Sequence, residues 1–493
     1  MAQQLTNMDG TFLYTDTRNT PETIGNFGIY DPSTARDGFV RFKDILRTFE
    51  TRIDVVPAAS RKIMRVPMDL DHPYWVEDTG FDLEYHVRHI ALPKPGDWRQ
   101  LCILIARLHS HPLDLDRPLW QSYVIEGLDG IDGVPKGCFA HYIKYHHAAF
   151  DGMAANDFLM ALHDSSPVFP EGEFGSDRKK RRTADKPGVP EMVARSYTNF
   201  LKQQLNMAKI GAGALPQLAK ERKFRKKHGL EKTPSKPDTR FNTPVSPNRV
   251  YAALEFPFSK VKEIRAAVPG VTINDLAVTI VSRALRKYLH TKKELPEESL
   301  IALTPVSLRK QEDAGGGGNS VSGLIVPIHT NIEDPLETLK AVNNTMTKSK
   351  AQRLEVGDSM LVKLVDTIPS LVQSGFGKLM DISPRIGMPA GPANTVISNV
   401  PGPRAHMYLA GAKAVKFHGI GILQHGIGLF NVVSSYLDNV TISFLACREQ
   451  MPDPDVYEAA IREAFDEIYE ATLKGEITPK VKTVTKAKSK KKK

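Results

Sequence analysis

The sequence predicts an α/β protein built of two lobes. Strand-like segments rich in aromatic and β-branched residues alternate with segments whose apolar residues recur at helical spacing. At 493 residues the chain is too long for one ordinary hydrophobic core. Its 41% hydrophobic and 25% charged residues are typical of a globular protein. We therefore expect two mixed layers of strands and helices, with a functional site where strands end.

The first lobe is expected over residues 1–170. Strands are predicted at 25–30, 63–66, 74–76, 119–125 and 139–145, and helices at 38–49, 99–109 and 153–162. The last strand leads directly into the stretch His146-His147-Ala148-Ala149-Phe150-Asp151-Gly152. Neighbouring side chains on a strand point to opposite faces, so only one of the two histidines is expected to face a site. Gly152 lets a backbone or a substrate approach closely.

Residues 171–245 are expected to form a basic, partly helical linker between the lobes. They hold 18 lysines and arginines against eight acidic residues. Within them, five apolar residues recur at helical spacing: Val193, Tyr197, Phe200, Leu201 and Leu205. This apolar stripe with basic flanks could lie on a membrane surface, or it could pack against a lobe; the sequence leaves both interpretations open.

The second lobe is expected over residues 246–479, followed by a disordered lysine-rich tail over 480–493. Strands are predicted at 251–256, 301–306, 322–329, 396–400, 415–422, 428–435 and 439–447, and helices at 258–268, 273–288, 335–351, 359–379 and 455–473. Thr272 and Asn274 are both candidates for capping the second helix. The tail holds eight lysines and no acid, which predicts either a solvated extension or attraction to anionic lipid headgroups.

Several common sites are not predicted. The histidine stretch lacks the HExxH spacing that places two metal ligands one helical turn apart, so we expect no metal. The glycines at 315–318 are not followed by the lysine and hydroxyl residue of a phosphate-binding loop, and no GxSxG motif of a serine hydrolase is present. Nucleic acid is not an expected partner, because the lysine tail lacks the interleaved aromatic residues that stack on bases.

Seven segments together resemble the bacterial wax ester synthase/diacylglycerol acyltransferase family, a branch of the CoA-dependent acyltransferases. The HHAAFDG stretch at 146–152 is similar to that family's active-site motif. The resemblance spans nearly the whole chain and extends to six further segments, in order: Met8-Asp9-Gly10-Thr11-Phe12-Leu13, Arg117-Pro118-Leu119-Trp120, Thr272-Ile273-Asn274-Asp275, Pro305-Val306-Ser307-Leu308-Arg309, Gly318-Asn319 and Ser398-Asn399-Val400-Pro401-Gly402-Pro403.

This resemblance implies a fold and a site. The fold would be two chloramphenicol-acetyltransferase-like lobes, each a mixed sheet with flanking helices, with an active-site tunnel at their interface. His147 would be the general base, and His146 would orient it, line the alcohol side or pack. Asp151 would pair with Arg309, with Gly152 and Asp275 as further structural support. Asn274 is either an oxyanion or substrate-orienting donor or a helix cap. Leu119, Trp120 and Asn399 would line the substrate channel, although Trp120 could equally form a rigid corner in the core.

The implied reaction moves a long-chain acyl group from acyl-CoA, a co-substrate, to a fatty alcohol or a diacylglycerol without any cofactor. The alternatives are a same-fold acyltransferase with another acceptor, and a non-catalytic protein that binds lipid surfaces. Cys102, Cys138 and Cys447 are odd in number and widely spaced, which favours a reducing compartment. With neither a secretion signal nor a run apolar enough to span a bilayer, we expect a cytoplasmic protein. It would bind an anionic inner membrane face or lipid inclusions peripherally, through linker and tail.

Overall fold

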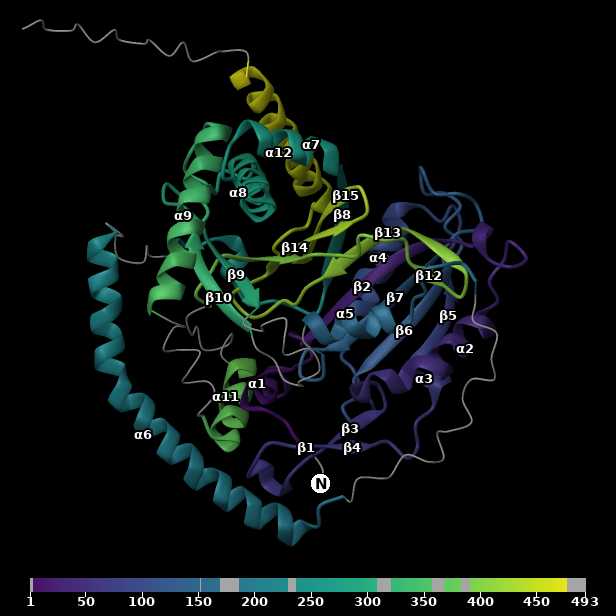
Figure 1. Ribbon diagram of the computed structural model, residues 1–493, viewed down its shortest axis with the longest axis vertical. Helices are drawn as coiled ribbons and strands as arrows, with labels where there is room; N and C mark the ends of the chain where they lie inside the picture. Colours follow the sequence, from purple (N-terminus) through teal and green to yellow (C-terminus); the bar gives the residue numbers. More distant parts are fainter. Residues whose placement is uncertain are drawn as a thin grey trace, which may run out of the picture.

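A computed structural model describes residues 3–150, 152–168, 186–228, 236–307, 321–356, 368–382 and 391–476 (Figure 1). Several positions named from the sequence lie outside these ranges: Asp151, Arg309, the glycine run 315–318, Asn319 and the tail 480–493. The described chain forms two mixed six-stranded sheets with helices packed on them, together with a small three-stranded sheet. The expected two-lobed α/β architecture is confirmed.

The first sheet carries the histidine motif near its centre. Its strands, in spatial order, are β12 (Tyr408–Leu409), β13 (Ala412–Ile420), β2 (Thr23–Asp31), β7 (Phe139–His146), β6 (Trp120–Glu126) and β5 (Val87–Ala91). All neighbours are antiparallel except β5 and β6, which are parallel. The aromatic and β-branched residues of β7 favour a strand. Every residue in this strand is buried.

The second sheet forms the centre of the other lobe. Its order is β10 (Val321–Pro327), β9 (Ile301–Ser307), β11 (Thr395–Val400), β14 (Leu429–Tyr436), β15 (Asn439–Cys447) and β8 (Arg249–Pro257). β11 runs parallel to both of its neighbours, and the other pairs are antiparallel. The small sheet comprises β1 (Gln3–Gln4), β4 (Tyr74–Glu77) and β3 (Arg61–Met64). Only β1, β5 and β12 have no counterpart among the strands expected from the sequence.

The chain crosses between the lobes more than once. β12 and β13 lie in the residue range 246–479, yet β13 pairs with β2 in the first sheet before the chain returns to the second sheet at β14. A buried cluster correspondingly combines first-sheet residues such as Phe27 and Tyr142 with second-sheet residues such as Tyr251 and Leu445. The lobes therefore share part of their hydrophobic core.

The helices cover the sheets. Those of the first lobe are α2 (Phe42–Arg52), α3 (Leu83–His86) and α5 (Gly152–Ala161), and α4 (Trp98–Ser110) packs against β8 at the lobe junction. Those of the second lobe are α7 (Phe258–Ala267), α8 (Ile273–Thr291), α9 (Pro335–Val356) and α12 (Pro454–Glu476). Short 3-10 turns occur at Pro32–Thr34, Ile53–Val55, Pro57–Ala59, Pro67–Asp69 and Arg240–Asn242. α8 starts in a capping box in which Thr272 and Asp275 satisfy each other's backbone N–H groups, so Thr272 and not Asn274 is the cap.

Two helices pack together beside the motif. α1 (Asn7–Thr15) was not among the expected helices, and α11 (Ser370–Ile382) is the described part of the helix expected over 359–379. Pro369 precedes α11, and its carbonyl accepts the N–H groups of Val372 and Gln373. A Cβ on Gly377 would lie 2.0 Å from the carbonyl oxygen of Tyr14, so glycine allows α11 to approach the backbone of α1.

α6 (Val189–Lys227) is one long helix that runs along the outside of the molecule, away from both sheets (Figure 1). Its apolar stripe points outward: the exposed fractions of Tyr197 and Leu205 are 67% and 65%, and Val193, Phe200 and Leu201 are also exposed. The interpretation that this stripe packs against a lobe is therefore wrong. The helix is instead attached through its polar face and through the buried residues Met192 and Phe224. No helix in the described ranges is long and apolar enough to cross a bilayer.

Candidate active site

The two histidines of the motif are held at the end of β7, between β2 and β6. The backbone N–H of His146 donates to the carbonyl of Leu119 at 2.9 Å, and that of His147 donates to the carbonyl of Glu22 at 2.8 Å. The N–H groups of Ala149 and Phe150 then bond to the His146 carbonyl and form a turn that leads into α5. Their backbone is thus fixed by segments on both sides of the strand.

His146 is fully buried, and both of its ring nitrogens face protein groups. Nδ1 accepts the N–H of Ala148 at 3.1 Å, so the neutral ring carries its proton on Nε2. Nε2 lies 3.3 Å from Oδ2 of Asp16, the C-cap of α1, in a polar contact without hydrogen-bond alignment. His146 therefore connects the turn after β7 to the end of α1.

His147 has different surroundings. Its side chain is only half-buried, and its ring stacks on Phe12 of α1 with the ring centroids 4.0 Å apart and the planes inclined by 25°. An aromatic face against the imidazole limits the orientations that the ring adopts. Of the two histidines, His147 is the one with a partly open side chain and a fixed ring orientation. Both properties suit a general base.

Two acidic residues next to the motif, Asp16 and Glu22, were not predicted from the sequence. Oδ1 of Asp16 accepts the N–H of Glu22 at 3.0 Å, and Glu22 is 0% exposed. Oε1 of Glu22 accepts hydrogen bonds from Thr15 at 2.9 Å and from Gln424 at 3.0 Å. Gln424 follows β13, where the chain crosses between the sheets, so this contact spans the lobe junction. The available signal was the polar run 15–22, which directly precedes the strand that pairs with β7.

In the Arg117-Pro118-Leu119-Trp120 segment beside the motif, the last three residues are buried in the core. Leu119 packs against Ala148, and its carbonyl holds His146. Trp120 is 0% exposed; its ring stacks on Phe49 and its Nε1 donates to the carbonyl of Ala59 at 2.8 Å. These contacts match the rigid-corner interpretation of Trp120, and a channel role for either residue stays a prediction.

The remaining predicted residues lie in the second lobe or outside the described ranges. Asn274 is half-buried in the first turn of α8, and no hydrogen bond within the described ranges joins it to His146 or His147. Asp275, which caps the same helix, also accepts a hydrogen bond from Asn343 at 2.9 Å. Asn399 lies half-buried on β11 opposite Val433. Gly152 begins α5, whereas its neighbour Asp151 and the proposed partner Arg309 are not described.

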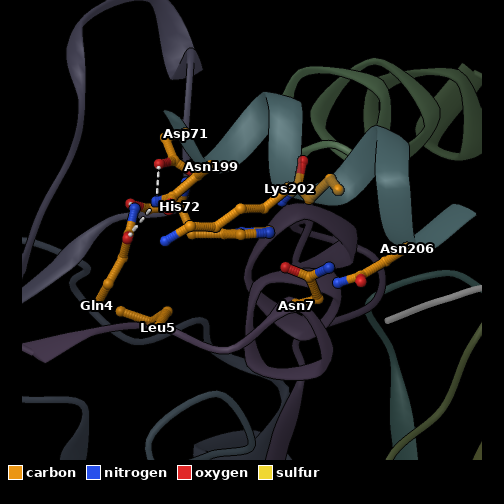
Figure 2. Close-up of a pocket in the computed structure, with 9 residues that line it drawn as sticks. Gln4, Leu5, Asn7, Asp71, His72, Asn199, Lys202 and Asn206 are labelled. Atoms are coloured by element: carbon orange, nitrogen blue, oxygen red, sulfur yellow. Dashed lines mark hydrogen bonds between the residues drawn. The ribbon is translucent and has the colours of Figure 1, made fainter. Parts of the chain in front are cut away.

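A polar cavity of about 320 Å³ lies elsewhere, beneath α6 (Figure 2). It is lined by Gln4, Leu5, Asn7, Asp71, His72, Asn199, Lys202, Gln203 and Asn206. None of these residues belongs to the motif, so this cavity is not the expected tunnel, which stays a prediction. Within the described ranges, no three histidine, cysteine or acidic side chains are grouped as metal ligands would be.

Comparison with known proteins identifies the family. The model of the wax ester synthase/diacylglycerol acyltransferase catalytic domain matches residues 5–277, and that of the WS/DGAT C-terminal domain matches residues 317–469. A Mycobacterium tuberculosis protein, provisionally named a diacylglycerol O-acyltransferase, is 31% identical over 452 residues, which cover 90% of this chain and 94% of that protein.

Solved structures share the fold. The wax ester synthase/diacylglycerol acyltransferase from Marinobacter aquaeolei VT8 is 23% identical, with a TM-score of 0.65 over 95% of this chain and 99% of that one. A starter condensation domain of rhizomide synthetase, solved with C8-CoA and Leu-SNAC, is 12% identical, with a TM-score of 0.53 over 96% and 94%. The two family models together span both lobes and include the histidine motif. The chain therefore belongs to the wax ester synthase/diacylglycerol acyltransferase family of acyltransferases.

Proposed function

We propose that the chain transfers a long-chain acyl group from acyl-CoA to the hydroxyl group of a fatty alcohol or a diacylglycerol, with His147 as general base. The chief support is the contrast between the two histidines of the motif. His146 is buried with both nitrogens against protein groups, whereas His147 is half-buried and oriented by Phe12. Acyl transfer to an alcohol needs one such base in a site shielded from water.

In the proposed reaction, Nε2 of His147 accepts the proton of the alcohol hydroxyl while the alcohol oxygen attacks the thioester carbon. The tetrahedral intermediate then collapses, the carbon–sulfur bond breaks, and the imidazolium returns the proton to the departing CoA thiolate. No covalent enzyme intermediate, metal or cofactor takes part. A histidine suits both proton transfers, because its unperturbed pKa of about 6.5 lies close to neutral pH.

The experiment is an acyl-transfer assay on the full chain. Purified protein is incubated with palmitoyl-CoA and either hexadecanol or dipalmitoylglycerol, while released thiol and ester product are followed together. We expect thiol release that depends on at least one acceptor and matches the ester formed. Thiol release that is independent of both acceptors, or absent with both, would contradict the proposed function.

The proposed partner surface is an anionic lipid layer, bound through the outward face of α6. A helix of a water-soluble domain normally buries its apolar stripe, but α6 turns Asn199, Lys202 and Gln203 toward the protein and exposes Tyr197 and Leu205. Four basic residues near its C-terminal end are exposed as well: Arg222, Lys223, Lys226 and Lys227. This arrangement suits insertion of the apolar face among lipids and attraction of the basic end to their headgroups.

A further inference from the structure

One carboxyl oxygen of Glu22 has no hydrogen-bond partner among the described residues. The residue is 0% exposed, and its Oε1 accepts two hydrogen bonds, from Thr15 and Gln424. Its Oε2 is buried, and no group in the described part of the chain forms a hydrogen bond with it. Leaving a buried polar atom unpaired costs free energy, so such an atom calls for a functional explanation.

The Glu22 side chain emerges on the same face of the sheet as that of His147. Thr23 is paired with His146 in the antiparallel ladder of β2 and β7, so Glu22 stands opposite His147. The 2.8 Å bond from the His147 N–H to the Glu22 carbonyl continues that register. Directly opposed residues on antiparallel strands direct their side chains to one face, with Cβ atoms about 5 Å apart.

Both side chains also contact α1. Phe12 and Thr15 are three residues apart on α1 and therefore share one helix face. Phe12 stacks on His147, and Thr15 donates to Glu22. The base and the acid thus lie against the same face of the same helix.

The surroundings of Glu22 favour the protonated acid. Burial is the main cause that raises its pKa to about 8; the hydrogen bonds from Gln424 and Thr15 lower the pKa, and the neighbouring carboxylate of Asp16 adds a smaller increase. Its titratable neighbours are Asp16, which follows α1, and the two histidines at the end of β7; Gln424, from the other lobe, is uncharged. Because Oε1 accepts both hydrogen bonds, Oε2 is the oxygen that carries the proton.

We propose that Glu22 is a further catalytic residue, whose Oε2–H donates a hydrogen bond to the carbonyl oxygen of the acyl thioester as His147 activates the alcohol. This inference rests on the proposed acyl transfer. Negative charge accumulates on that oxygen in the tetrahedral intermediate, and a fixed donor in a dry site stabilises it. Because Oε2 is buried, its hydrogen bond to the thioester carbonyl requires the thioester to enter at the lobe junction beside Gln424. The proton stays on Glu22 throughout, and collapse of the intermediate releases the hydrogen bond.

The test compares two substitutions at this position. Glu22→Ala removes the donor, and we expect kcat to fall about 100- to 1,000-fold, as for other lost oxyanion donors, with the KM for palmitoyl-CoA little changed. Glu22→Gln keeps the shape and an N–H donor, so kcat should stay within about tenfold of wild type. Wild-type kcat should decline above about pH 8, where Glu22 ionises, and Glu22→Gln should lose that decline.

Glu458→Gln is the matched control, because burial also raises the pKa of Glu458, which lies on α12 in the second lobe. This variant should keep the wild-type pH profile. The inference is overturned if Glu22→Ala retains wild-type kcat, if it changes only the KM for the acceptor, or if Glu22→Gln keeps the alkaline decline. Should Glu22→Ala fail to fold, the pH profile of Glu22→Gln decides alone. An inactive wild-type protein would instead contradict the proposed function itself.

Discussion

His146 and His147 are neighbours in the chain, yet the fold gives them different surroundings. At the end of β7, the His146 ring lies beside Asp16, whereas the His147 ring stacks on Phe12. The alternation of side chains along a strand predicted different surroundings for the two rings, and that only one of them faces a site stays a prediction. The sequence could not predict Asp16 or Glu22 as neighbours, since both are more than 120 residues away and reach the motif through strand pairing and through α1.

Glu22 predicts a pH-dependent stability that can be measured without substrate. Its folded pKa of about 8 lies above its ordinary value of 4.5, so between these values the folded chain holds a proton that the unfolded chain has lost. Over that window the free energy of unfolding should fall by about 1.4 kcal/mol per pH unit through this residue. Glu22→Gln lacks this contribution. In urea denaturation, the variant's stability relative to wild type should therefore rise steadily from pH 5 to pH 8, and a constant difference would contradict the assignment.

At the scale of single elements, long periodic segments were predicted well and short irregular ones were not. β15 and the strands around the motif were expected within one or two residues, because their β-branched and aromatic content is high. α1 was missed because it is short and includes Gly10, and β5 was missed because the adjacent Arg88 and His89 interrupt its apolar residues at the sheet edge. The direction of the α6 stripe depends on tertiary contacts, which periodicity alone does not reveal.

α6 gives a prediction about lipid binding. Replacing Leu201 and Leu205 together by glutamate should weaken binding to vesicles that contain phosphatidylglycerol at least about tenfold, because two apolar side chains no longer enter the lipid. Both residues are exposed, so the thermal unfolding midpoint should not change. Leu354→Glu, at an 89% exposed position on α9, is the control and should bind normally.

Co-sedimentation with vesicles measures this binding. Unchanged binding by the Leu201→Glu/Leu205→Glu variant would show that α6 is not the docking element. Deletion of residues 480–493 provides the complementary arm, because the tail is the other basic segment of the chain. Loss of binding on this deletion alone would assign docking to the tail.

At the scale of the whole molecule, the lobes are held together by a strand and a shared core. β13 adds to the first sheet between two segments of the second lobe, and Gln424 follows it to reach Glu22. The two-lobed α/β class followed from length and from alternating elements, and the lobe architecture came from the family resemblance. The return of β12 and β13 to the first sheet was not predicted, because local sequence patterns do not specify which sheet a strand joins.

Histidine burial across both lobes predicts acid lability. Burial lowers the pKa of His109, His141 and His418 to about 3, and that of His72, His86 and His163 to about 4. Below about pH 6.5 the histidines of the unfolded chain bind protons, whereas those of the folded chain stay neutral. Each of these histidines therefore lowers the free energy of unfolding by about 1.4 kcal/mol for each pH unit of acidification. Together, these six histidines lower the free energy of unfolding at acidic pH by more than Glu22 raises it. The thermal unfolding midpoint should fall clearly from pH 7 to pH 5, and a constant midpoint would contradict this prediction.

The most direct measurement of the central claim is the turnover of His147→Ala with palmitoyl-CoA and the acceptor that the wild-type protein uses. His89→Ala, on the edge strand β5, serves as the control and should keep wild-type kcat. Loss of the general base should lower kcat at least about 100-fold while the thermal unfolding midpoint stays near that of wild type. A folded His147→Ala protein with kcat close to wild type would contradict the account.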